Sequence, residues 1–299
     1  MKIGIKGINR VSATATVALT AGAVIAGSAF ASTAQAATLP VPTIAAKGGY
    51  VMNNGTASSL YSKAADTRRA TGSTTKIMTA KVVLAQTNLN LDSKVTIQKA
   101  YSDYIVAKGA SSARLIVGDK VTVRQLLYGL MLPSGCDAAY ALADKFGTGT
   151  TRAARVTSFI GKMNASAKSL GLTNTHFDSF DGISNGSNYS TPRDLTKIAS
   201  SAMKNSTFRT VVKTKSTTQK VTTSSGGYRY MSWTNTNKLL GSYTGAIGVK
   251  TGSGAIAGYC LVFAATRDGK TVIGTVLAST SETTRTADAT KLMNYGFSK

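Results

Sequence analysis

The stretch ATGSTTKIMTA, from Ala70 to Ala80, places the hydroxyl group of Ser73 three residues before the amine of Lys76. Residues three apart share one face of a helix, so the two side chains can meet if a helix begins here. The apolar residues that continue through Leu84 predict that this helix is largely buried. A serine hydroxyl is a poor nucleophile until a base removes its proton, and a neutral lysine can act as that base. The alternative is a helix cap beside a solvated lysine.

Serine and lysine at this spacing are not specific by themselves, because Ser201 and Lys204 repeat the pattern. Two further patterns make a catalytic role more specific. PSGCDAAYALAD places Ser134 in a turn before a helix, and GVKTGSGAIAGYC places Lys250–Gly252 on a strand that ends in a turn. Taken singly, they are a turn serine and a strand-end lysine. Their combination and order point to a serine nucleophile with helper groups.

Strand patterns occur near both ends of the chain. Pairs of strand-like runs surround Asn54-Gly55 and Asp268-Gly269, and both dipeptides are strong hairpin signals. The Ser/Thr-rich residues 211–227 predict an exposed hairpin or loop. Helical patterns fill the middle and close the chain, at residues 121–135, 137–147, 157–172, 190–205 and 281–297.

This order predicts an α/β fold of the α+β type, with an antiparallel sheet built from both ends of the chain. We expect the sheet part at about residues 45–100 and 225–299, and a mainly helical insertion at about 101–224. The helix at 190–205 has the clearest start. Thr191 can cap it, Pro192 suits its first position and Asp194 suits its positive end.

Residues 1–36 have the features of a secretory signal peptide. A basic beginning is followed by an apolar run of small residues, and AQA fits a cleavage site before Ala37. The alternative is an uncleaved membrane anchor. No later stretch approaches the ~18 apolar residues that cross a bilayer. We therefore expect residues 37–299 to be a single exported domain, without a transmembrane segment.

The chain is strongly basic, with 35 lysines and arginines against 12 acidic residues and a net charge of +23. Removal of residues 1–36 takes away three positive charges and leaves +20. An exported protein rarely meets nucleic acid, so anionic wall polymers or a membrane surface fit this charge better. The alternative is that the lysines only aid solubility. Two cysteines, Cys136 and Cys260, are too few for a disulfide scaffold, and we expect free thiols.

Together the three patterns resemble the active-site serine D-alanyl-D-alanine carboxypeptidases, the low-molecular-mass penicillin-binding proteins of peptidase family S11. That family has a serine with lysine three on, a Ser-x-Asn turn and Lys-Thr-Gly. This chain has STTK, SGC and KTG in the same order. Other similar stretches are LLYGLMLPSGCDAAYALAD, NTHFDSFDGIS, YSTPRDL, WTNTNKLL and AGYCLVFAATRDG. The resemblance covers about residues 45–299 and implies a β-lactamase/transpeptidase-like fold.

The resemblance implies a catalytic role for three residues. Ser73 would attack the carbonyl between the last two D-alanines of a peptidoglycan stem peptide, and Lys76 would be the general base. Ser134 would relay a proton toward the leaving amine. The activity implied is that of a serine-type D-Ala-D-Ala carboxypeptidase, which β-lactams inhibit covalently and which needs no metal or organic cofactor.

The remaining matches imply substrate binding. Lys250 and Thr251 would hold the terminal carboxylate of the substrate, and Gly252 would let the substrate lie close to the strand. Backbone N–H groups of Ser73 and Ser253 would form the oxyanion hole. The charge of Lys250 also disfavours protonation of a lysine nearby.

One position departs from the family pattern, because Cys136 stands where asparagine is usual. A thiol is a much weaker hydrogen-bonding group than an amide, so the positioning of substrate is altered there. Some relatives with transpeptidase behaviour resemble this form, which makes a DD-transpeptidase the alternative activity. Cys136 as the nucleophile is a further alternative. Cys260 lies on an apolar strand and is expected in the core.

Two other serine hydrolases are alternatives. A β-lactamase of similar motifs deacylates through a glutamate between the second and third motifs, but Glu282 is the only glutamate in the chain. The aspartates at 178, 181 and 194 do not match that pattern, so we expect penicillin to acylate Ser73 and leave slowly. A histidine-based triad would need His176, the only histidine, which a loop or packing role explains equally.

A non-catalytic, cationic wall-binding protein is an alternative of a different class, although the motif residues are intact. Many relatives carry a further β-rich domain and a C-terminal amphipathic anchor. The chain ends soon after its last expected helix, so we expect the catalytic domain alone, outside the membrane at a bacterial cell wall.

Overall fold

A five-stranded antiparallel sheet joins the two ends of the described chain. The structure is a computed structural model that describes residue 12 and residues 39–299, so the expected signal segment lies outside the described residues except for residue 12. The strand order is β2-β1-β9-β8-β7, which confirms the expected α/β fold. The strands are β1 (Gly48–Asn53), β2 (Ser59–Lys63), β7 (Ala246–Gly254), β8 (Gly258–Arg267) and β9 (Lys270–Ser279).

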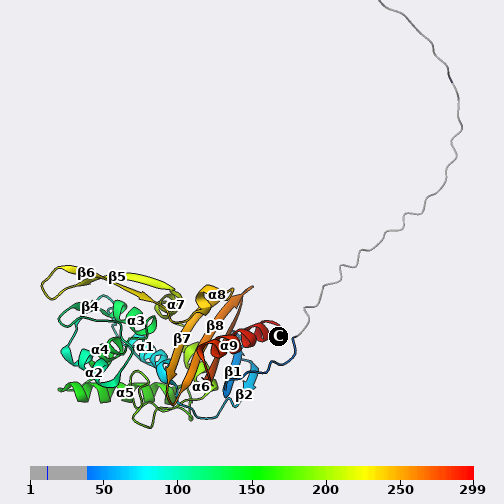
Figure 1. Cartoon of the computed structure of the whole chain (residues 1–299), viewed down its shortest axis with the longest axis horizontal. Helices are drawn as coiled ribbons and strands as arrows, with labels where there is room; N and C mark the ends of the chain where they lie inside the picture. Colours follow the sequence, from blue (N-terminus) through cyan, green and yellow to red (C-terminus); the bar gives the residue numbers. More distant parts are fainter. Residues whose placement is uncertain (1–11, 13–38) are drawn as a thin grey trace, which may run out of the picture. The chain divides into compact units, whose positions relative to one another are not determined.

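This sheet is covered on both faces. Successive side chains of a strand point to opposite faces, and in β8 Leu261 and Phe263 pack into the cluster formed with α9 (Glu282–Phe297). Val262 and Ala264 belong to the larger cluster on the other face, which includes α6 (Pro192–Ala202). Burial on both faces explains why the β8 sequence is apolar without alternation. Figure 1 shows α9 running alongside β8 and β1.

A second sheet lies on the helical side of the molecule, with the order β3-β4-β5-β6. Residues 94–96 and 228–234, expected in the main sheet, belong to it instead. The strands are β3 (Lys94–Thr96), β4 (Lys120–Thr122), β5 (Ser216–Thr222) and β6 (Tyr228–Thr234). The expected hairpin near residues 211–227 is confirmed by the β5–β6 pair, which Figure 1 shows extending to the upper left.

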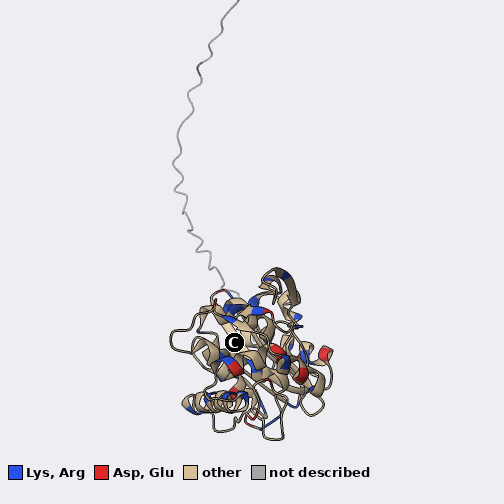
Figure 2. Ribbon diagram, turned by 90° about the vertical axis from the view of Figure 1, so that its left-hand side faces the viewer, with Lys and Arg blue, Asp and Glu red and all other residues tan. Residues whose placement is uncertain are grey.

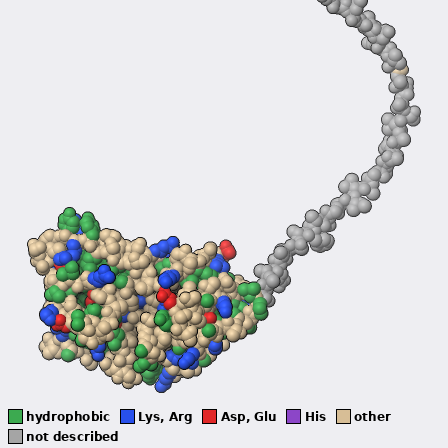
Figure 3. Space-filling view, viewed as in Figure 1, with side chains coloured by type: hydrophobic (Ala, Val, Ile, Leu, Met, Phe, Trp, Pro, Cys, Tyr) green, Lys and Arg blue, Asp and Glu red, His purple; other side chains and the backbone are tan. Residues whose placement is uncertain are grey.

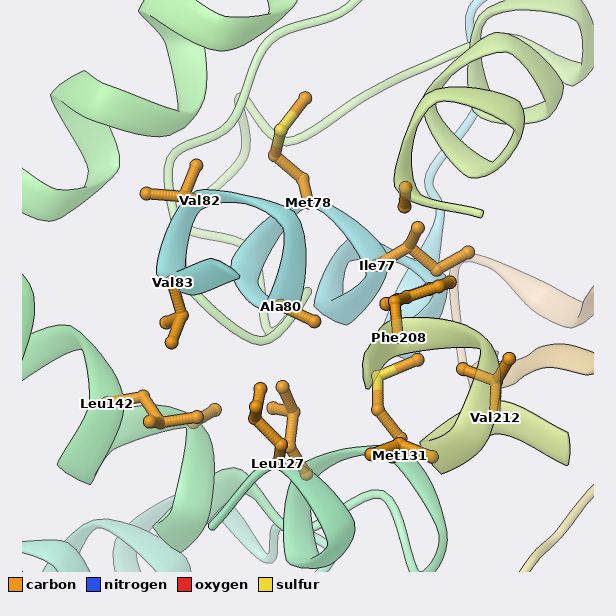
Figure 4. Close-up of a cluster of buried hydrophobic side chains, with 14 of the residues drawn as sticks. Ile77, Met78, Ala80, Val82, Val83, Leu127, Met131, Leu142, Phe208 and Val212 are labelled. Atoms are coloured by element: carbon orange, nitrogen blue, oxygen red, sulfur yellow. The ribbon is translucent and has the colours of Figure 1, made fainter. Parts of the chain in front are cut away.

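Helix α1 (Lys76–Leu84) is the centre of the larger core. Its side chains point outward around the helix to different neighbours (Figure 4). Leu127 and Met131 approach it from one helix, Leu142 from a second and Phe208 from a third. A helix that is apolar on every side belongs in the interior, as the sequence predicted. The surrounding helices are α2 (Lys99–Lys108), α3 (Val123–Met131), α4 (Cys136–Phe146), α5 (Arg152–Ser169) and α7 (Ser206–Lys213), and the short α8 (Leu239–Ser242) precedes β7.

Most local signals are confirmed. The Thr191 hydroxyl accepts a hydrogen bond from the Asp194 backbone at 3.0 Å, with Pro192 at the first position of α6. Asp268 and Gly269 both have positive φ, 46° and 76°, as a two-residue hairpin turn requires. The hairpin at Asn54-Gly55 also forms, but its turn is longer, because the backbone of residue 53 pairs with residue 58.

The described residues 39–299 lie within one compact unit. Among the residues that the structure describes, no helix is both long and apolar enough to span a bilayer.

Candidate active site

Ser73 lies in a single 3₁₀ turn, Gly72–Thr75, that leads directly into α1. Its Oγ atom is 2.9 Å from the Nζ atom of Lys76, so the predicted meeting of the two side chains is confirmed. The same spacing at Ser201 and Lys204 gives no such pair, because Lys204 points to solvent beyond the end of α6. The Ser-x-x-Lys spacing therefore brings the two side chains together at the buried start of α1 but not at the end of α6. We call residues 71–75 the serine turn.

Lys76 is fully buried, with 0% of its surface exposed. Its amine contacts three acceptors: the Ser73 hydroxyl, the Cys136 sulfur at 3.3 Å and the Asp181 carbonyl at 3.0 Å. These contacts aim the nitrogen at the serine oxygen. The Asp181 carbonyl is a backbone group, which no side-chain motif could have predicted. The neighbouring Gly182 has φ +93° and packs so closely on the serine turn that a Cβ there would collide with the backbone.

A network of hydroxyl groups supports the serine turn from behind. The Asn188 amide donates to the Thr71 hydroxyl at 2.9 Å and to the Thr75 hydroxyl at 3.1 Å. Those two hydroxyls are 2.8 Å apart, and all three residues are buried. Hydrogen bonds between buried polar groups restrict them to one conformation, although the Asn188 side-chain carbonyl oxygen of this network has no partner among the described residues. The network therefore fixes the backbone that carries Ser73, and the sequence analysis did not predict it.

The second motif brings Ser134 and Cys136 to the same place. Ser134 has φ +67°, and its carbonyl accepts a hydrogen bond from Ser111 at 2.6 Å. Its buried hydroxyl has no hydrogen-bond partner among the described residues, which leaves it able to exchange partners during a reaction. Cys136 begins α4 beside Lys76. Burial raises the pKa of the Cys136 thiol, although the Lys76 charge opposes this.

The third motif packs directly against the serine turn. A Cβ atom on Gly252 would lie 2.8 Å from the Thr71 carbonyl oxygen and 3.0 Å from the Thr74 nitrogen. The missing side chain therefore makes room for the protein's own backbone. The expected role of Gly252, which is to let the substrate lie close to the strand, stays a prediction.

Lys250 lies behind the cleft and not on its wall. Only 1% of its surface is exposed, and its amine donates to the Thr251 carbonyl at 3.0 Å. Burial, and then the charge of Lys76, hold the pKa of Lys250 well below its ordinary value. Thr251 and Ser253 do line the cleft, and the Thr251 hydroxyl is 2.6 Å from the Thr236 hydroxyl.

The described cleft wall carries five basic residues that were not predicted: Arg68, Arg69, Lys108, Lys238 and Arg285. The Arg285 guanidinium donates to the carbonyls of Gly252 at 3.3 Å and Cys260 at 3.4 Å, from helix α9. Burial lowers its pKa, and Glu282 opposes that shift. Lys238 forms an ion pair with the same Glu282 at 3.3 Å. The sequence analysis did not identify Arg285, because no motif marked it as a cleft residue.

The cleft that these residues line has a volume of about 1030 Å³ and contains Ser73, Ser134 and Cys136 as well. Within the described part of the chain, Glu282 is the only carboxylate residue on its wall. His176 is exposed, pairs through its backbone with Tyr189 and lies outside the cleft lining. The expected free thiols are confirmed for both cysteines. The residues from 39 onward contain no group of side chains suited to hold a metal ion.

A family model described as "D-alanyl-D-alanine carboxypeptidase", peptidase S11, matches residues 33–281. The chain belongs to this family. The D-alanyl-D-alanine carboxypeptidase of Streptomyces sp. (strain K15) is 74% identical over 96% of this chain and 99% of its own length. The carboxypeptidase DacF of Bacillus subtilis is 31% identical over 85% of this chain and 62% of its own length. The resemblance inferred from STTK, SGC and KTG is thereby confirmed.

Solved structures of S11 peptidases agree with this fold. The crystal structure of the Streptomyces K15 DD-transpeptidase has a TM-score of 0.87 and 79% identity, covering 87% of this chain and 100% of its own. The D-alanyl-D-alanine carboxypeptidase DacD of Francisella tularensis has a TM-score of 0.76 and 30% identity, over 87% and 72% of the two chains. The protein is therefore a serine hydrolase of this family with the expected architecture.

Proposed function

We propose that the protein removes the terminal D-alanine from peptidoglycan stem peptides through an acyl-enzyme at Ser73. The observation that carries this proposal is the 2.9 Å contact between the Ser73 hydroxyl and the Lys76 amine at the wall of a large cleft. The family membership of the chain supports the same reaction class. Lys76 contacts the hydroxyl directly, and no other amine in the described structure does so.

Acylation begins when the Lys76 amine accepts the proton of Ser73 and the serine oxygen attacks the peptide carbonyl. Burial and the charge of Lys76 lower the pKa of Lys250, so the two buried amines disfavour simultaneous protonation. The proton then passes through the Ser134 hydroxyl to the leaving amine of D-alanine. The carbon–nitrogen bond of the peptide then breaks, and the acyl group remains bound to Ser73 as an ester.

The carboxylate of the substrate meets the wall formed by Thr251 and Arg285. Both line the cleft, and the Arg285 guanidinium already lies against the Gly252 carbonyl. Because Lys250 is buried behind Thr251, its amine does not line the wall that meets this carboxylate. The N–H groups of Ser73 and Ser253 stabilise the oxyanion.

The acyl group can pass to water, which is hydrolysis, or to an amine, which is transfer. DD-transpeptidase activity is the second candidate, and the observation that favours it is the 79% identity to the K15 structure named for that activity. β-Lactams acylate Ser73 in either case. The penicilloyl ester is hydrolysed slowly, because the described cleft wall offers no carboxylate except Glu282 to activate water.

The proposed place of action is outside the membrane, at the cell wall of a bacterium, after removal of residues 1–36 as a signal peptide. There the enzyme trims stem peptides during wall biogenesis, which influences cell shape. After that removal, the net charge of +20 supports attraction to anionic wall polymers.

The test is incubation with a peptide ending in D-Ala-D-Ala, with free D-alanine measured. Adding glycylglycine as an acceptor measures the share of acyl groups transferred. We expect D-alanine release that stops when one equivalent of penicillin has labelled the protein. Release that continues at full rate after stoichiometric labelling would exclude the proposal.

A further inference from the structure

The solvent-facing side of the second sheet concentrates lysines and tyrosines. Directly paired residues of neighbouring strands share one face. Lys120 pairs with Thr222, which pairs with Tyr228, and Lys220 pairs with Tyr230. Lys94 belongs to the same face, because it reaches across β4 to donate to Thr222 at 3.1 Å. We call these five residues the lysine–tyrosine face: Lys94, Lys120, Lys220, Tyr228 and Tyr230.

The opposite side of the same sheet is core. Val95, Val121 and Val221 are buried there, so alternation along the strands explains why lysines face solvent. This alternation does not explain why two large side chains, Tyr228 and Tyr230, remain 60% and 64% exposed. Their rings are 5.8 Å apart, edge to face, and the Lys220 amine lies 4.0 Å from the centre of the Tyr228 ring. Figure 3 shows apolar and basic side chains gathered over this hairpin.

The lysine–tyrosine face carries cations without matching acids. Its strand positions in the described sheet contain no aspartate or glutamate. Asp119 lies buried on the other side and pairs with Arg229 at 2.9 Å. Asp92, near Lys94, pairs with Arg124 at 3.3 Å. Figure 2 shows how few acidic residues accompany the basic ones on the fold as a whole.

We propose that the lysine–tyrosine face binds an anionic cell-wall polymer that carries repeated phosphodiester charges. The inference rests on the proposed function at the wall and assigns the contact to one surface. Three exposed ammonium groups attract a chain of fixed negative charges, and the tyrosine hydroxyls can donate hydrogen bonds to phosphate oxygens. The hairpin tip does not suit insertion into a membrane, because residues 223–227 read TSSGG and contain no apolar side chain.

The position of the face links polymer binding to the cleft. Strand β6 carries both tyrosines and ends at Thr234, and two residues later Thr236 lines the cleft and contacts Thr251. Eight residues of extended chain span roughly 26 Å. A polymer held on the face would therefore keep the wall, and the stem peptides attached to it, within reach of Ser73.

The test is cosedimentation of the full protein with isolated bacterial walls, before and after hydrofluoric acid removes their phosphodiester-linked polymers. The variant is K94Q/K120Q/K220Q, and the matched control is K168Q/K204Q/K291Q, which removes the same charge from other exposed positions. We expect the face variant to bind untreated walls at least about tenfold more weakly, and the control to bind within about twofold of the parent. Stripped walls should bind the parent as weakly as untreated walls bind the face variant.

Three results would overturn the proposal. Equal losses in the face variant and the control would mean that net charge alone acts. Undiminished binding to stripped walls would exclude the polymer. Equal affinity for vesicles containing phosphatidylglycerol, with the same dependence on the face lysines, would identify a membrane instead. Y228S/Y230S provides a second test if the lysine variant unfolds. D-alanine release from a soluble peptide should be unchanged in the face variant, so failure of the proposed reaction is detected separately.

Discussion

A Cβ atom on Gly252 would lie 3.1 Å from the backbone nitrogen of Ser73. The backbones of strand β7 and the serine turn therefore pack so closely that position 252 has no room for a side chain. Ser73 and Ser253 both line the cleft, and we propose that their N–H groups stabilise the negative charge of an oxyanion there. The motif glycine thus shapes the site from within the protein.

Substitution of this glycine tests the packing. In Gly252→Ala the new methyl group must push the serine turn away, and we expect a loss of about 1–3 kcal/mol in the free energy of unfolding. Acylation by fluorescent penicillin should slow at least about tenfold. The control is Gly161→Ala in α5, where a Cβ meets nothing within 4 Å. Unchanged labelling and stability in Gly252→Ala would contradict the role of this contact.

Arg285 is expected to recognise the carboxylate of the substrate. In Arg285→Gln the KM for a peptide ending in a free carboxylate should rise about tenfold, because a charge-assisted hydrogen bond is lost. The KM for the corresponding peptide amide should change little. Lys238→Gln is the control, since Lys238 pairs with the same Glu282 but is largely exposed. Equal losses for acid and amide substrates would assign Arg285 a purely structural role.

Lys250 should make stability depend on pH. Its pKa in the folded protein lies below the ordinary value of 10.5, so the unfolded chain binds more protons between those two values. The cost of burying Lys250 is therefore full below the folded pKa and decreases as pH rises toward 10.5.

Replacement of Lys250 by an apolar side chain should remove this cost. In urea titrations we expect Lys250→Met to be more stable than the parent at pH 7, and the difference to shrink at about pH 10. Activity should be lost in the same variant. A difference that grows with pH would contradict the direction of the shift.

Cys136→Ala separates two roles of the thiol. Lys76 would keep two of its three acceptors, Ser73 and Asp181. We expect kcat/KM to fall about tenfold or less, the effect of one lost hydrogen bond. If Cys136 were the nucleophile, both D-alanine release and penicillin labelling would disappear. Mass spectrometry of the penicillin adduct locates the labelled residue in parent and variant.

Much of the fold could be predicted because its signals are local. The cap at Thr191, the turn at Asp268-Gly269 and the apolar helix after Ser73 each depend on residues close together in the chain. The second sheet could not be predicted. Strands β3 and β4 have three residues each, too few to show alternation, and β4 pairs with a strand about a hundred positions later.

The site was predictable where side-chain chemistry marks it. The meeting of Ser73 with Lys76 follows from helical spacing, and the structure confirms it. Three features depend on long-range packing instead: the Asp181 carbonyl on Lys76, the burial of Lys250 behind Thr251, and the arrival of Arg285 from α9. A backbone acceptor leaves no residue signature, and the depth of a lysine depends on every element around it.

The most direct test of the central claim compares Ser73→Ala with Ser201→Ala. Both variants remove the serine of a Ser-x-x-Lys pattern, but only Ser73 contacts its lysine at the cleft. We predict that Ser73→Ala forms no covalent penicillin adduct and that its rate of D-alanine release falls by a factor on the order of 10³ or more. Ser201→Ala should match the parent in both measurements. A folded Ser73→Ala protein that still forms the adduct and releases D-alanine at the parent rate would contradict the account.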